Sequence, residues 1–387
     1  MAERGFIGLA LLVLIVGCGA EQVEVAAPPP IYTQWNVSLA AGLDALLLIG
    51  AASGDAMQAH IYGEDIERAR NSVSEEGLAA MDQIDAMLRG RMGRLTGPSL
   101  VYLFSAGPIS TIDDVIESAA DPVAKLRPGH EQSPAWDENE FAAAVRMMPT
   151  LHTALVALRD AGFSDWYDVE LRQKIESAVE VNRAAVQAFD IIPEQERLLG
   201  HKLSPKIEIF IANYSKPYGI RILGQRFIAY YGYDGETQLH IAAHEIFHPP
   251  FDRQDTELVN LLKALENDAW MKSIVDTHDP QFGYNSFMAI VDEDSTQALD
   301  QIVSEHLGFD NDPGKRWRHS DGGMHVLAAA IYHAMKEDGF ATAGGEYSTW
   351  FKSALKRGLL SPESVRIRAT HVIGQEAVEN WNPDGKT

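Results

Sequence analysis

The feature that most restricts the fold is the stretch L-H-I-A-A-H-E-I-F-H at residues 239–248, which contains H-E-x-x-H. On an α-helix, His244 and His248 would lie one turn apart on the same face, so both imidazoles could bind one metal ion. Glu245 would lie beside them, where its carboxylate could act as a general base toward a metal-bound water. The motif therefore predicts a metal site on a helix. The simpler alternative is a surface helix that carries ordinary histidines.

The flanking residues agree with a helix. Asp234-Gly235 is a turn signal, and Pro249-Pro250 predicts that the helix ends after His248. The apolar positions between them are Leu239, Ala242, Ala243, Ile246 and Phe247. His240 is excluded as a ligand, because eight residues of helix rise by about 12 Å and separate it from His248.

A catalytic zinc site usually has three protein ligands and a water molecule, so a third ligand must come from another part of the chain. Metzincins take it from a histidine in H-E-x-x-H-x-x-G-x-x-H, but here His248 is followed by P-P-F-D-R-Q, which excludes that class. Residues 287–299 form an apolar helical pattern that carries acidic residues at 292–294. A buried carboxylate is costly unless it is paired or binds a metal. Glu293 is therefore the favoured third ligand.

Two other features bear on this choice. Glu293 shares a helix face with Gln297 and Asp300, which could orient the ligands. Glu257 and Glu266 compete for the role, but their more evenly charged surroundings indicate a solvated helix face.

Composition limits the partners of this chain. Its 387 residues, 46% hydrophobic and 22% charged, suffice for one large domain or two moderate ones. The net charge of −23 argues against binding nucleic acid or anionic lipid headgroups through charge alone.

The N-terminus resembles a bacterial lipoprotein signal. Arg4 precedes an apolar run at 6–16, and the run leads to Cys18, the only cysteine of the chain. We predict a signal peptide at 1–17 and lipidation of Cys18, with residues 18–35 as a tether stiffened by three prolines. The alternative is an ordinary secretory signal with an incidental cysteine. The predicted location is the bacterial cell envelope, with a lipid anchor and with the outer membrane favoured by Gly19.

The remaining pattern predicts an α+β fold that is mostly helical. Residues 36–200 read as an all-helical region. Residues 201–387 read as a zincin-like domain in which a small antiparallel or mixed sheet precedes the histidine helix and a helical C-terminal subdomain. The strands are predicted at 206–212, 220–223 and 226–231. The helices are predicted at 256–276, 285–307, 322–335, 347–356 and 361–370.

A small strand unit, an H-E-x-x-H helix and a glutamate on a later helix resemble a gluzincin, a zinc metallopeptidase of the thermolysin-like group (peptidase MA). The resemblance covers residues 205–310. It implies that His244, His248 and Glu293 bind zinc, and that Glu245 transfers a proton from the zinc-bound water to the departing amine. It also implies that a strand within 226–231 pairs with an extended peptide substrate.

Hydrolysis also needs a donor that stabilises the oxyanion. The candidates are Tyr284, His319, His325 and Tyr332, although for His325 a role in capping or packing its helix is favoured. Asp252 could orient a zinc-bound imidazole, but its place after two prolines favours a turn.

The predicted function is that of a zinc-dependent peptidase acting on peptides or proteins of the cell envelope. Two alternatives remain, a non-catalytic binding or assembly factor on the same scaffold and a zinc hydrolase of cell-wall peptides. The oligomeric state and the role of the helical first half stay open.

Overall fold

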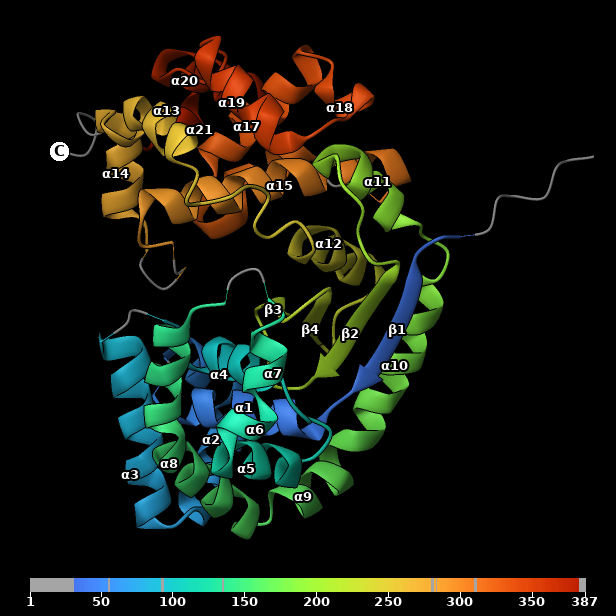
Figure 1. Ribbon diagram of the computed structural model, residues 1–387, viewed down its shortest axis with the longest axis vertical. Coiled ribbons are helices and arrows are strands. Elements are labelled where there is room, and N and C mark those ends of the chain that lie inside the picture. Colours follow the sequence, from blue (N-terminus) through green and yellow to red (C-terminus); the bar gives the residue numbers. More distant parts are fainter. Residues whose placement is uncertain are drawn as a thin grey trace, which may run out of the picture. The chain divides into compact units, whose positions relative to one another are not determined.

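The computed structural model contains a mixed four-stranded sheet in the order β1-β2-β4-β3 (Figure 1). Its strands are β1 (Gln34–Leu39), β2 (Lys206–Ala212), β3 (Ile220–Ile222) and β4 (Arg226–Tyr230). β2 is parallel to both β1 and β4, and β3 runs antiparallel to β4. In β2, Ile207, Ile209 and Ile211 are buried in alternation with more exposed residues, as its sequence predicts. The predicted α+β, mostly helical fold is confirmed.

The structure describes residues 31–54, 56–91, 94–133, 136–279, 282, 284–309 and 312–382. The predicted signal peptide, and Cys18 with it, lie outside the described residues. The described residues form one compact unit.

The strand β1 was not expected from the sequence, which reads as helical from residue 36 onward. Its six residues pair in register with β2, from Gln34 opposite Lys206 to Leu39 opposite Ile211. The prediction is wrong here because the apolar run after Val37 continues without a break into a buried helix, α1 (Ala41–Ala52). Local periodicity does not mark the change at residue 40, and the strand is defined by a partner far along the chain.

Helices make up nearly all of the first half. They are α2 (Ala56–Ser72), α3 (Glu75–Asp85), η1 (Ala86–Arg91), α4 (Thr96–Phe104), α5 (Ile112–Ala120), α6 (Pro122–Lys125), α7 (Arg127–His130), α8 (Glu138–Asp160), α9 (Phe163–Trp166), η2 (Tyr167–Leu171), α10 (Arg172–Val186) and α11 (Ile191–Leu199). α8 is long and apolar enough to cross a membrane, but it packs against α3 and α5. α10 packs along β1, as Figure 1 shows. It also contacts α12.

The second half surrounds the histidine helix with further helices. They are α12 (Gly235–Glu245), α13 (Thr256–Glu266), α14 (Ala269–Thr277), α15 (Phe287–Leu307), α16 (Pro313–His319), η4 (Ser320–Gly323), α17 (Val326–Glu337), α18 (Phe340–Ala343), α19 (Tyr347–Lys356), α20 (Pro362–Ile373) and α21 (Gln375–Glu379). The central helix is α15, which packs against α11, α12, α14 and α17. It is buried from Ile290 to Ser304, acidic residues included.

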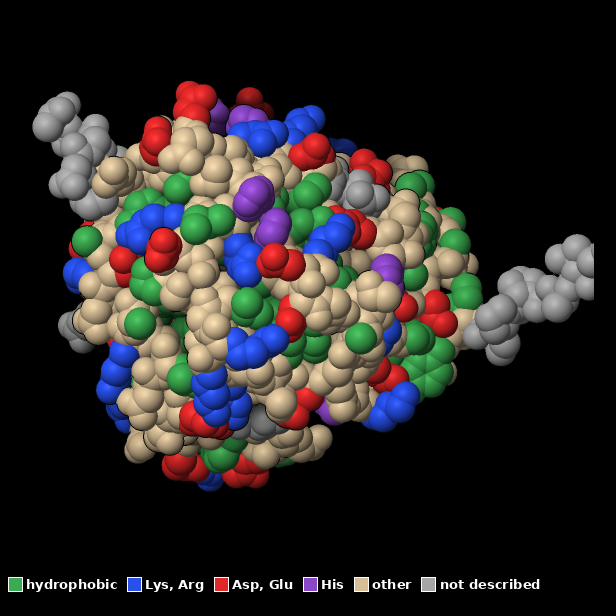
Figure 2. Space-filling model, turned by 90° about the horizontal axis from the view of Figure 1, so that it is seen from above, with side chains coloured by type: hydrophobic (Ala, Val, Ile, Leu, Met, Phe, Trp, Pro, Cys, Tyr) green, Lys and Arg blue, Asp and Glu red, His purple; other side chains and the backbone are tan. Residues whose placement is uncertain are grey.

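Charged side chains of both signs are interspersed on the face drawn in Figure 2. Many exposed basic residues form ion pairs, such as Arg357 with Asp338 and Lys356 with Glu257. The acidic excess of the chain is therefore not gathered into one patch on that face.

Candidate metal centre

Helix α12 presents His244 and Glu245 at its C-terminal end. The helix begins at the cap residue Asp234, whose carboxylate accepts a hydrogen bond of 2.9 Å from the Thr237 amide. Near its other end, the buried side chain of Gln195 donates to the carbonyls of Ala242 and Ala243. The last carbonyls of a helix generally lack a partner within it, so Gln195 satisfies these two and fixes the position of the last turn.

Pro249-Pro250 predicts that the helix ends after His248, but α12 already ends at Glu245. The amide of Phe247 donates to the carbonyl of His244 over 3.0 Å, which tightens the turn. A residue before a proline disfavours the helical conformation, so the chain leaves the helix before it reaches the prolines. His248 therefore follows the helix, yet its ring stays close to His244, with centroids 4.7 Å apart.

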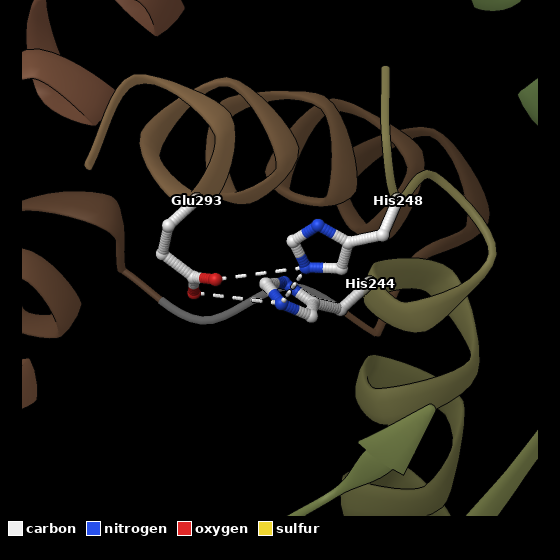
Figure 3. Close-up of side chains that lie close together, drawn as sticks. All are labelled: His244, His248 and Glu293. Carbon is white, nitrogen blue, oxygen red and sulfur yellow. Dashed lines mark hydrogen bonds and ion pairs between the residues drawn. The ribbon is translucent and has the colours of Figure 1, made fainter. Parts of the chain in front are cut away.

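The third predicted ligand, Glu293, comes from the first half of α15 and is 7% exposed. Figure 3 shows its carboxylate directed at the two imidazoles, which come from the chain segment on the opposite side. The structure thus brings together His244, His248 and Glu293. Among the described residues, they are the one group of three whose potential ligand atoms lie close enough to hold a metal ion, all within 4.8 Å of one another.

The spacing of the three side chains fits a tetrahedral ion. The Nε2 atoms of the two histidines are 3.0 Å apart, and they lie 3.4 Å (His244) and 3.5 Å (His248) from the Glu293 carboxylate. Two ligand atoms that each lie 2.0–2.1 Å from a tetrahedral zinc ion are separated by about 3.3 Å. Two histidines and one glutamate are also a known donor set of catalytic zinc. The residues present therefore fit the expected metal.

Asp300 and Arg316 hold His244 in place from behind. The Nδ1 atom of His244 lies 2.8 Å from Oδ2 of Asp300, which is buried two turns after Glu293 on the same face of α15. Arg316 of α16 contacts both oxygens of that carboxylate, with Nη2 donating to Oδ2 over 2.9 Å. A carboxylate on the far nitrogen fixes the ring orientation and leaves Nε2 for the metal.

The neighbouring residue of α16 supports Glu293. The indole of Trp317 donates to Gln297 over 2.8 Å, and the amide of Gln297 donates to Oε1 of Glu293 over 2.9 Å. The predicted role of Gln297 and Asp300 as orienting groups agrees with these contacts. Arg316 and Trp317 were missed in the sequence, since nothing local indicates that α16 packs behind the site.

His248 has a weaker support on its far side. Its Nδ1 atom lies 3.3 Å from the hydroxyl of Thr296 and 3.7 Å from the carboxylate of Asp292. Asp292 is in turn paired with Arg253. Asp252 does not take this role, because its carboxylate accepts from the Gln254 amide in a turn.

The electrostatics of the cluster show why a cation suits it. Burial disfavours charge on Glu293, but the two imidazoles hold its pKa well below the usual value. Burial also opposes protonation of His244, whereas Glu293 and Asp300 raise its pKa well above the ordinary range. Burial and the charge on His244 lower the pKa of His248 to about 4. One of the two histidines thus holds a positive charge beside the buried carboxylates, at the place where a metal ion would supply it.

Glu245 lies apart from these contacts, in the wall of a cavity of about 1310 Å³. Its carboxylate has no hydrogen bond or ion pair with any residue that the structure describes. Burial raises the pKa of Glu245, although His244 and His248 oppose the shift. The backbone of Gly219 approaches this carboxylate so closely that a Cβ atom there would lie 3.2 Å from Oε1. Glu245 can therefore act on a molecule in the cavity.

Of the four candidate oxyanion donors, Tyr284 lines the cavity, and the other three do not. Burial and the neighbouring Glu293 carboxylate raise the pKa of Tyr284 well above its usual value, so its hydroxyl stays protonated. His325 is buried with Nδ1 2.6 Å from Asp294 and Nε2 2.8 Å from Asp321, so both nitrogens are already occupied. Tyr332 donates to Glu305, and His319 is exposed.

The excluded and competing ligands lie away from the cluster. His240 contacts the hydroxyl of Ser304 over 3.2 Å and packs its ring against Phe309. Glu257 forms ion pairs with Lys352 and Lys356 on the surface, and Glu266 is exposed.

The predicted substrate-pairing strand needs a correction. The segment 226–231 contains β4, which lies between β2 and β3 and has no free edge. The edge strand beside the site is β3. It pairs with β4 along one edge, and its other edge has no strand partner among the described residues. A peptide that pairs with this side of the sheet would have to pair with β3.

The cavity joins the two halves of the chain. One wall carries the cluster and Glu245, from α12, the residues after it and α15. The other comes from α2, α4 and α8 and from the residues just before α4 and α8. The second wall is rich in apolar and aromatic groups, among them Ile61, Leu95, Tyr102, Trp136 and Phe141. Its volume exceeds the roughly 300–1,000 Å³ of sites for small molecules. No family model, curated protein or solved structure matches this chain.

Proposed function

We propose that this chain is a zinc-dependent peptidase that hydrolyses peptide bonds in the bacterial cell envelope. The observation that carries the proposal is the convergence of His244, His248 and Glu293 beside the carboxylate of Glu245, in the wall of a large cavity. No described residue forms a hydrogen bond or an ion pair with that carboxylate. A structural zinc site has four protein ligands, whereas a catalytic site has three and an open position. The described residues offer three. The arrangement therefore favours a catalytic site of the gluzincin type.

Each side chain of the site has a separate role in the proposed reaction. Zinc, when bound, supplies Lewis acidity and lowers the pKa of an attacking water toward about 7. Glu245 takes the proton of that water and passes it to the departing amine, and its raised pKa brings it closer to the working pH. The protonated hydroxyl of Tyr284 donates to the developing oxyanion. Asp300, held by Arg316, keeps His244 in one orientation throughout.

The replacement Glu245→Gln tests the proposal directly. It removes the base and spares all three ligands, so we expect full zinc content and a loss of cleavage of about 10²–10⁴-fold. The measurements are zinc by mass spectrometry and cleavage of a fluorogenic peptide library, on protein that begins at residue 19. His248→Ala should lose the zinc, and the surface variant Glu257→Gln should behave as the wild type does.

Three outcomes would contradict or narrow the proposal. A wild-type protein that binds no zinc would exclude every zinc hydrolase. Zinc without cleavage of any peptide would favour the binding or assembly factor, and cleavage of cell-wall peptides alone would favour the narrower hydrolase.

We also propose that lipidation of Cys18 places the enzyme on a membrane surface, an inference that rests on the sequence alone. Cys18→Ala should move the protein from the membrane fraction to the soluble fraction of cells. An unchanged distribution would exclude the anchor.

A further inference from the structure

The edge strand β3 carries an arginine next to the candidate base. Ile220 and Ile222 are buried, 5% and 0% exposed, so one face of the strand enters the core. Arg221 lies on the other face, and Gly219, two residues earlier, shares that direction. The nearest atoms to a Cβ at Gly219 belong to Ile241 and Glu245 of α12. Arg221 therefore projects from β3 on the side of the strand where Glu245 lies.

The guanidinium of Arg221 lacks the contacts that buried arginines normally make. Arg316 is bound to Asp300, and Arg226 donates to the carbonyls of Leu223 and Ser105. For Arg221, by contrast, no hydrogen bond and no ion pair within 4.0 Å joins it to any part of the chain that the structure describes. Its side chain is half-buried, and this burial lowers its pKa. A cation that is partly removed from water without a partner is costly, which indicates a partner outside the chain.

Arg221 does not itself line the cavity, but Glu245 and Tyr102, with which it interacts electrostatically, both do. It also interacts with Arg253, which is already paired with Asp292. Glu245 is too far away for an ion pair, so its carboxylate stays free for its role as base.

We propose that Arg221 binds a carboxylate of the substrate peptide, next to the bond that Glu245 acts on. The planar guanidinium can hold a carboxylate through two parallel hydrogen bonds, which fixes the direction of the peptide along β3. The carboxylate has two sources, the free C-terminus of the peptide or an Asp or Glu side chain. This inference rests on the proposed function, because it names the substrate class of the same site.

The negative net charge of the chain makes a positive group at the site important for binding a carboxylate. A net charge of −23 repels acidic peptides in general. A cation beside the cleft that pairs with no described residue would let the enzyme accept a negative group at that one position. Cleavage would then depend on a negative group at a fixed position relative to the bond that is cut.

The test measures binding separately from cleavage. Three peptides of one sequence are compared, the first with a free C-terminus, the second amidated, and the third amidated with one Gln replaced by Glu. Their affinities are measured by fluorescence anisotropy on the Glu245→Gln protein, which should bind without cutting. The same measurements follow after adding Arg221→Gln, Arg221→Lys or the surface control Arg159→Gln.

We expect one of the two charged peptides to bind about tenfold more tightly than the neutral one, and Arg221→Gln to remove that advantage. Arg221→Lys should retain part of it, because the charge remains while the two-pronged geometry is lost. The neutral peptide and the Arg159→Gln protein should be unaffected. Which charged peptide responds identifies the source of the carboxylate.

Equal affinity of all three peptides, or an equal loss for all three with Arg221→Gln, would overturn the proposal. So would an Arg221→Gln enzyme whose pH profile of cleavage shifts while its preference for charge stays, since Arg221 would then act on Glu245. A failure of the proposed function appears elsewhere, as the lack of zinc or of cleavage in the wild type.

Discussion

At the scale of single residues, Asp300 joins the metal cluster to the rest of the protein. It lies 2.8 Å from His244 on one side and is bound by Arg316 on the other, and all three side chains come from different helices. Burial raises the pKa of Asp300, but Arg316 and His244 outweigh it and leave the pKa below the usual value. Asp300 is therefore a charged positioning residue, and it should act on metal affinity rather than on the chemical step.

The replacement Asp300→Asn keeps the volume and removes the charge. We expect the affinity for zinc to fall about 10–100-fold, as it does when a carboxylate behind a metal-bound histidine is lost. The measurement is a competition with a chromogenic chelator, with Glu257→Gln as the control. Unfolding of the metal-free protein should also become easier by roughly 3 kcal/mol, because Arg316 loses its buried partner. An unchanged zinc affinity would exclude the positioning role.

The sequence indicates the residues of the cluster but not those that support it. His244, Glu245 and His248 follow from a short motif, and Glu293 from an acidic group within an apolar helix. Arg316, Arg253 and Arg221 carry no such local signal, because each acquires its role from a partner on another element. An isolated arginine in a sequence reads as a surface residue until the fold places it.

At the scale of elements, the approach of β3 to α12 depends on a glycine. A Cβ atom at Gly219 would lie 2.7 Å from Cγ2 of Ile241 and 3.2 Å from Oε1 of Glu245. The glycine therefore allows the edge strand to lie directly beside the base.

Gly219→Ala should displace Ile241 and Glu245 and lower the rate of cleavage more than the stability. Overpacking of this kind costs about 1–3 kcal/mol, which the fold can tolerate. The matched control is Gly63→Ala, because a Cβ at Gly63 meets no atom within 4 Å. We would compare kcat and the melting temperature of both variants. An active Gly219→Ala enzyme would show that the close approach has no functional role.

A second element-scale feature is the contact between α1 and the loop after β2. Asp44 is fully buried in α1, and its Oδ1 atom accepts from the amides of Asn213 (2.7 Å) and Tyr214 (3.1 Å). Its Oδ2 atom has no hydrogen-bond partner among the described residues. Burial raises the pKa of Asp44 to about 7, although the two amides oppose the shift.

The sign of the resulting pH dependence follows from that pKa. Between about pH 4 and pH 7 the folded state holds a proton that the unfolded state has released, so this contribution to stability is lost as the pH rises. Asp44→Asn keeps the acceptor oxygen and cannot ionise. From pH 5 to pH 8 the wild type should lose about 2–3 kcal/mol relative to the variant in urea unfolding. Parallel losses in both proteins would contradict the prediction.

Several elements of the second half were predicted closely, whereas β1 was not. The helix predicted at 256–276 is two helices, α13 and α14, and the short helices α16, α18 and α21 were not predicted. β2 and α19 have the predicted bounds, because alternation and helical spacing are strong there. β1 and α1 lie in one apolar run, and only the pairing with β2 separates them. Local pattern therefore predicts elements that stand alone, and it fails where a partner more than 150 residues away defines the boundary.

At the scale of the whole molecule, the two halves share both the sheet and the cleft. β1 from the first half pairs with β2 from the second along its full length. Gln195 of α11 satisfies the end of α12, and a Cβ at Gly235 would meet Ala185 of α10 at 2.2 Å. The apolar wall that faces Glu245 also belongs to the first half. The helix that carries His244 is thus supported by residues that precede position 200.

This arrangement makes a prediction about the division at residues 200 and 201. A fragment of residues 201–387 would leave β2 with an unpaired edge and α12 without Gln195 or α10, so we expect no cooperative melting and no zinc binding by it alone. Expression together with residues 31–200 should restore both, because the missing strand and helices can dock. The measurements are calorimetry and zinc content, with the intact chain as the reference. A fragment that melts cooperatively and binds zinc would instead establish the second half as an autonomous domain, and the first half would then serve only as a wall of the cleft.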